Sequence, residues 1–129
     1  MAGIDIDDLT AAVSDIIGAY SDEVTEAVKQ SVDEVAQETM NVIKEHSTFR
    51  GSGRYVKAMA LKTTEDTGTS KTRVWYVKKP YYRLTHLLEH GHASRNGGRV
   101  RAFPHIKYGE DYAQKELPKK VKEKINELS

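Results

Sequence analysis

The residues with the clearest chemical potential are four histidines and one glutamate that lie close together in the sequence. Residues 86–90 read His-Leu-Leu-Glu-His, formally H-x-x-E-H, in which two imidazoles one helical turn apart bind zinc and the glutamate activates water. His92 and His105 follow, but no characteristic ligand spacing links them to the first pair. A small zinc metallopeptidase is therefore one alternative for this chain.

Several features of the sequence weigh against that alternative. Gly91 ends the helix directly after the string, no distinctive third ligand follows, and few residues remain for a substrate cleft. The chain has no cysteine, and it has no nucleophile elbow, nucleotide-binding glycine fingerprint or paired-acid motif. We therefore expect no enzymatic activity, no catalytic residue, no metal ligand and no cofactor, with the histidines satisfied or on the surface.

Length and composition suit one domain over residues 1–129, because 129 residues with 38% hydrophobic content can bury a single modest core. The absence of cysteine excludes a disulfide-stapled fold. Residues 1–8 carry acids rather than a basic and then apolar stretch, and nowhere do 18 apolar residues run together. We expect a soluble protein with no membrane partner, made in a cytoplasm-like compartment.

The small net charge of +1 hides a strong segregation of charge along the chain. Residues 1–46 hold eleven acids and two lysines, a net charge of −9, whereas residues 47–107 hold thirteen Lys or Arg and three acids, a net charge of +10. Such asymmetry indicates an acidic partner for the middle segment, either nucleic acid or the acidic part of another copy. A dipolar but merely solvated surface is the other interpretation.

The N-terminal third has the pattern of an amphipathic helix. Apolar residues recur at three- and four-residue spacing from Leu9 to Ile43, with acids largely between them. Ser21 followed by two acids looks like an N-cap. We expect a short helix or turn within 1–21 and a long acidic helix over 22–46, longer than a domain of this size needs for its own core.

The middle of the chain predicts an antiparallel strand pair over residues 55–78. Tyr55–Thr64 and Thr72–Lys78 are rich in β-branched, aromatic and alternating residues, and a turn-like stretch separates them. The last segment, 110–129, predicts a helix in two pieces, because Pro118 lies inside its pattern. We thus expect an α+β fold in which the sheet is packed by the long N-terminal helix and the C-terminal helix.

Residues 80–106 predict a short helix followed by a basic loop. Asn96-Gly97-Gly98 disfavours regular structure, and almost no apolar side chain anchors the loop over 92–102. We expect this loop to be mobile in the free subunit and ordered in an assembly. Its arginines suit phosphate or acidic protein surfaces: Arg95, Arg99 and Arg101. A non-specific nucleic-acid-binding protein of a mobile element is the first alternative function.

The order of segments resembles the HK97 gene-product-10-like family of tailed-phage proteins over nearly the whole chain. The most specific parts are the Leu-Leu-Glu-His-Gly-His string at 87–92 and the Pro-His-Ile restart at 104–106. The positions that match are Leu87, Leu88, Glu89, Gly91, His92, Gly97, Gly98, Pro104 and His105. The resemblance implies that these are structural and assembly positions. His46-Ser47-Thr48 departs from the proline-containing turn of many relatives.

The resemblance further implies a structural virion protein that acts in head–tail joining or tail completion. Family members look like ring-forming neck subunits between portal and tail tube. The implied partners are other copies in a hexameric or dodecameric ring, connector or stopper proteins, tail-tube or tail-terminator proteins, and phage DNA in the lumen. The implied location is the virion neck, with assembly in the host cytoplasm.

Overall fold

The computed structural model describes the backbone of residues 11–16, and both backbone and side chains of residues 21–68 and 70–128. The elements are, in chain order, β1 (Ala11–Ile16), α1 (Asp22–Glu45), α2 (Gly53–Lys57), β2 (Met59–Asp66), β3 (Ser70–Val77), the 3-10 turn η1 (Tyr81–Arg83), α3 (Leu84–His90), β4 (His92–Ala93), β5 (Arg99–Val100) and α4 (Ile106–Glu127).

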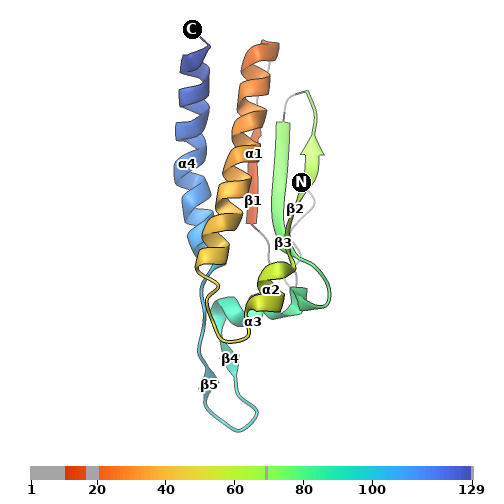
Figure 1. The fold of residues 1–129 in the computed structure, drawn as a ribbon, viewed down its shortest axis with the longest axis vertical. Helices are drawn as coiled ribbons and strands as arrows, with labels where there is room; N and C mark the ends of the chain where they lie inside the picture. The colour runs from red at the N-terminus through yellow and green to blue at the C-terminus, as the bar shows by residue number, and fades with distance from the viewer. Residues whose placement is uncertain (1–10, 17–20, 69, 129) are drawn as a thin grey trace.

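The described chain forms an elongated body with two long helices beside a sheet. Helices α1 and α4 lie side by side in opposite directions, and α1 separates α4 from most of the sheet (Figure 1). The sheet is antiparallel with strand order β1-β3-β2. The short helices and the β4–β5 hairpin lie at the end of the molecule far from the C-terminus. The predicted α+β fold, with its sheet packed by both long helices, is confirmed.

Helix α1 has the start that the sequence predicts. The Ser21 hydroxyl accepts a hydrogen bond from the Val24 N–H at 3.3 Å, and Asp22 and Glu23 lie at the positive end of the helix dipole. Helix α4 packs so closely against α1 that a Cβ on Gly109 would collide with the Ile43 side chain. The helix predicted over 22–46 is therefore confirmed to within one residue.

The expected short helix or turn within 1–21 is wrong for the part that the structure describes. Residues 11–16 are a strand, with Ala11 opposite Trp75 and Ile16 opposite Ser70. The helical spacing of apolar residues continues through this segment, but the ladder that it forms with β3 outweighs that local preference. The remaining residues of this predicted segment, 1–10 and 17–20, lie outside the described residues.

Two further boundaries differ from the predictions. Tyr55 to Lys57 belong to α2 rather than to a strand, and β2 begins at Met59. Helix α4 begins at Ile106 rather than at Glu110 and continues through Pro118 as one helix. Proline has no N–H for the carbonyl four residues earlier, but Gln114 and Pro118 are both exposed, so water can reach that carbonyl.

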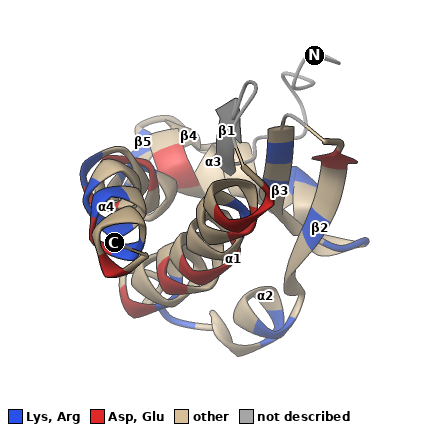
Figure 2. Ribbon diagram, turned by 90° about the horizontal axis from the view of Figure 1, so that it is seen from above, with Lys and Arg blue, Asp and Glu red and all other residues tan. Residues whose placement is uncertain are grey.

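Ion pairs within the chain use several of the acids of α1. Asp33 contacts Lys71 at 2.9 Å, and Glu38 contacts Lys120 at 3.2 Å. Figure 2 shows acidic residues along α1, with basic residues on α4 and β3. Part of the charge segregation in the sequence is thus neutralised between elements of one subunit. Among the described residues, none of the helices combines the length and apolar character that a membrane crossing requires.

Candidate functional site

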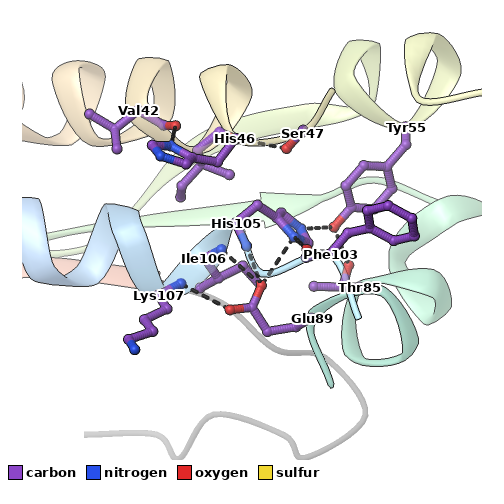
Figure 3. Close-up of polar contacts among 11 residues, drawn as sticks. Val42, His46, Ser47, Tyr55, Thr85, Glu89, Phe103, His105, Ile106 and Lys107 are labelled. Carbon is purple, nitrogen blue, oxygen red and sulfur yellow. Dashed lines mark hydrogen bonds and ion pairs between the residues drawn. The ribbon is translucent and has the colours of Figure 1, made fainter. Parts of the chain in front are cut away.

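The junction between α3 and α4 is built around the carboxylate of Glu89. Its Oε1 accepts hydrogen bonds from the backbone N–H groups of His105 at 2.8 Å and Ile106 at 2.9 Å, and its Oε2 from Lys107 at 3.0 Å (Figure 3). The N-cap residue of α4 is His105, and its side chain makes no capping hydrogen bond. Glu89 therefore caps α4 from the preceding helix, where a negative charge also complements the helix dipole.

The environment of Glu89 favours its ionised form. Burial alone would raise the pKa of this carboxyl, but the hydrogen bonds from the His105 ring and from three backbone N–H groups outweigh it and lower the pKa to about 2. A carboxylate held this way is a weak base, and its oxygens are already engaged. This geometry suits a structural cap and not the water-activating glutamate of a zinc peptidase.

The His105 ring connects this cap to α2 through a buried row of polar groups. Its Nδ1 lies 2.8 Å from the Phe103 carbonyl and 3.0 Å from Glu89 Oε1; both are acceptors, so Nδ1 carries a hydrogen. Its Nε2 lies 2.7 Å from the hydroxyl of Tyr55, which also lies 3.3 Å from the Thr85 hydroxyl. Burial raises the pKa of Tyr55, which keeps this phenol protonated.

The two ends of the β4–β5 hairpin come together at this junction. The Phe103 N–H donates to the Leu88 carbonyl at 2.6 Å, and Gly91 ends α3 with a φ of 73°. A Cβ on Gly91 would lie 2.7 Å from the Val100 carbonyl oxygen, so only glycine fits without displacement. His92 pairs with Val100 across the hairpin. The basic loop predicted here therefore includes a short strand pair, whereas Asn96, Gly97 and Gly98 lie in its turn without regular structure, as predicted.

The arginines of the hairpin are exposed, as expected for a segment without an anchor in the core. Residues 95–101 are all exposed, and Gly97 and Gly98 turn the chain with positive φ. Arg99 donates to the His90 carbonyl at 3.0 Å, and the Arg101 guanidinium lies 5.3 Å from the centre of the Phe103 ring. The hairpin thus presents its positive charge at one end of the molecule. Its mobility in the free subunit stays a prediction.

The structure does not gather the histidines into a metal site. The rings of His86 and His90 lie 4.9 Å apart on exposed positions of α3, whereas His105 is buried against Tyr55. Within the described residues there is no group of three His, Cys, Asp or Glu that could hold a metal ion. The H-x-x-E-H string therefore serves two roles here, with its glutamate inside the fold and its histidines outside.

The remaining predicted assembly positions are divided between core and surface. Leu87 is 39% exposed, while Leu88 packs against the core cluster that contains Trp75 and Ile106. His92 is half-buried and Pro104 is exposed. These neighbours in the sequence thus perform different tasks: some hold the junction together and others lie at the surface.

Sequence reasoning missed the roles of Tyr55 and Thr85 and the groove next to them. This groove has a volume of about 340 Å³ and is lined by Phe49, Arg50, Gly51, Arg54, Tyr55, Tyr81, Leu84, Leu88 and Phe103. Its lining comes from four separate stretches of the chain, so no local motif marks it. The recurrence of arginine beside aromatic residues in these stretches is the signal that could have found it.

A comparison with protein-family models matches residues 11–91 to a family described as "Bacteriophage HK97-gp10, putative tail-component". The chain belongs to the HK97-gp10-like family. The match spans β1 to the Gly91 turn, so Glu89 lies inside it and the helix that Glu89 caps lies beyond it. Neither the curated proteins nor the solved structures gave a match. Membership of this family points to a structural component of a phage tail.

Proposed function

We propose that this protein is a structural virion protein of a tailed phage, and that it acts as a ring-forming neck subunit in head–tail joining or tail completion. The observation that carries the proposal is the family match over residues 11–91. The junction supports it, because the glutamate of the most distinctive string is used to cap a helix. We further propose that residues 1–129 form one domain.

The distribution of surface groups suits contact between copies that stand side by side. A ring needs a heterologous interface, in which two different patches of one subunit meet on neighbouring copies. Exposed apolar side chains lie at both ends of the body: Leu84, Leu87 and Val100 near the hairpin, and Ile125 and Leu128 at the end of α4. The proposed partners are copies in a hexamer or dodecamer, and connector, stopper, tail-tube or tail-terminator proteins.

Native mass measurement tests this proposal most directly. The purified protein is measured alone and after mixing with connector and tail components, and we expect a closed oligomer in at least one of these mixtures. Removal of the gene from the phage should leave filled heads and tails unjoined. A protein that stays monomeric in every mixture, in a phage whose particles join normally without it, would exclude the neck role.

The same preparation separates the proposal from nucleic-acid binding, which the exposed arginines of the hairpin also favour. Strongly salt-dependent affinity for DNA, with no oligomer in any mixture, would identify a binding protein of a mobile element. In the ring, the same arginines would face the lumen and contact phage DNA, or face acidic surface of a neighbour. Assembly in the host cytoplasm and a final place in the virion neck follow from this proposal.

A further inference from the structure

The groove beside α2 combines an apolar lining with basic groups. Tyr81, Leu84 and Leu88 lie along it, and Leu84 is 42% exposed. Arg50 and Arg54 are both exposed and complete its lining. Its volume of about 340 Å³ is at the small end of the range of pockets that hold a ligand. The groove therefore suits a short segment that carries apolar and acidic side chains together.

Three of the four aromatic rings that line this groove pack against one another. Phe49 and Phe103 pack against each other with ring centres 5.3 Å apart, and Phe49 also packs on Tyr55, with centres 5.8 Å apart. Arg101 lies over the Phe103 ring. Stacking of nucleic-acid bases needs an open ring face, so these contacts favour a peptide over a single-stranded nucleic acid.

We propose that the groove of one subunit binds the segment Ile4–Leu9 of a second copy. This segment reads Ile-Asp-Ile-Asp-Asp-Leu, so apolar and acidic residues alternate over its first four positions. In an extended chain, alternate side chains point to opposite sides, so Ile4 and Ile6 can face the lining while Asp5 and Asp7 face outward toward the rim. The three acids complement the two arginines of the groove in sign.

Binding of a terminal segment in a neighbour's groove generates a heterologous contact, in which each copy gives one segment and receives one. This inference rests on the proposed function and deepens it, since it names one contact between adjacent subunits of the ring. In the sequence, only Thr10 stands between Leu9 and strand β1. Repetition of this contact around a closed rotation would link all the copies.

Cross-linking through introduced cysteines tests the contact, because the natural chain contains no cysteine. One chain carries Ile6→Cys and an isotope-labelled chain carries Leu84→Cys; they are mixed under conditions in which native mass shows the oligomer, and oxidised. We expect a disulfide-linked pair that contains one chain of each mass. The matched control replaces Leu84→Cys by Gln114→Cys, an exposed position on α4 outside the groove lining, and should give no such pair.

A chain that carries both Ile6→Cys and Leu84→Cys distinguishes the two sources of the segment. If only this chain cross-links, and within itself, the groove binds its own segment and the proposal is overturned. If no variant cross-links although native mass shows a ring, the proposed function stands and this contact is wrong. If native mass finds no oligomer in any mixture, the proposed ring function and the proposed groove contact are both wrong.

A peptide-binding assay separately measures how much the groove arginines contribute to affinity for the segment. The probe is a fluorescent peptide of residues 2–12, and the receptor is the full chain with Ile4→Ser/Ile6→Ser, which weakens competition from its own segment. Adding Arg50→Ser/Arg54→Ser to the receptor should weaken binding about tenfold, as expected for the loss of two partly exposed charge contacts. The control Lys115→Ser/Lys122→Ser removes the same charge from exposed positions of α4 and should leave affinity unchanged. An equal loss of peptide affinity in both double variants would show general charge attraction and would contradict a binding site in the groove.

Discussion

The α3–α4 junction and the β4–β5 hairpin are neighbours in sequence and in space, yet they are built in opposite ways. The junction buries a carboxylate, an imidazole, a phenol and a threonine hydroxyl, each with a partner within hydrogen-bond distance. The hairpin exposes nearly all its side chains and is held by two strands of two residues each. From this comparison we predict that the junction carries stability and that the hairpin carries recognition.

Replacement of Glu89 should have the largest effect on stability. Glu89→Ala leaves the N–H groups of residues 105–107 without their acceptor inside the fold, and loss of a buried charged partner typically costs about 3 kcal/mol or more. Denaturant unfolding measures this loss. The control Glu123→Ala, at an exposed position of α4, should change stability by less than about 0.5 kcal/mol. Equal effects would remove the special role of the junction.

Acid should weaken the junction through the same carboxylate. The pKa of Glu89 falls from an ordinary 4.5 to about 2 in the folded protein, so its contribution is present above pH 4.5 and is lost as the pH falls toward 2. That contribution is on the order of 3 kcal/mol. Unfolding of wild type and Glu89→Gln across this pH range measures it. The difference between the two proteins should shrink with acid; a constant difference would contradict the assignment.

Substitution of Gly91 at the base of the hairpin should cost more stability than substitution of Gly97 at its tip. Gly91→Ala forces a side chain at positive φ against the Val100 carbonyl and should cost about 2 to 3 kcal/mol. Gly97→Ala keeps the unfavourable φ of 84° but meets no atom within 4 Å, so it should cost about 1 kcal/mol. Thermal unfolding of the two variants gives the difference. A tip variant as damaging as the base variant would mean that the hairpin is itself part of the stable core.

Replacement of all three hairpin arginines should have the smallest effect on stability and a clear effect on assembly. The variant Arg95→Ser/Arg99→Ser/Arg101→Ser removes exposed groups, and each exposed substitution changes stability by about 0.5 kcal/mol or less. Its melting temperature should stay close to wild type while the yield of tail-joined particles falls. Normal particle yield would remove the hairpin arginines from the mechanism.

Local signals in the sequence were sufficient for the elements whose causes are local. The Ser21 cap with its following acids predicted the start of α1, and Gly91 predicted the end of α3. The start of α4 could not be predicted in this way, because its cap is Glu89, in the preceding helix. Strand β1 was missed for a similar reason, since its structure comes from pairing with β3 about 60 residues later in the chain.

The candidate site shows the same limit. The string around Glu89 was recognised as a distinctive feature, and its resemblance indicated a structural role. Tyr55 and Thr85, which are linked to Glu89 through the His105 ring, were not predicted, because Tyr55 is 50 residues from His105 and was assigned to a strand. Helix propensity and strand propensity describe neighbours along the chain, whereas this network joins groups brought together by three separate elements.

The closed base of the hairpin has a consequence for how this protein tolerates changes in length. The hydrogen bond from Phe103 to Leu88, with Glu89 capping α4 beside it, fixes where the chain leaves the body and where it returns. Extra residues between Asn96 and Gly97 would therefore lengthen an exposed turn without moving either helix, and each doubling of a loop costs only about 0.6 kcal/mol. A peptide tag or reporter could be inserted there while the fold of the subunit stays intact, so the reach of the hairpin can vary independently of the body that carries it.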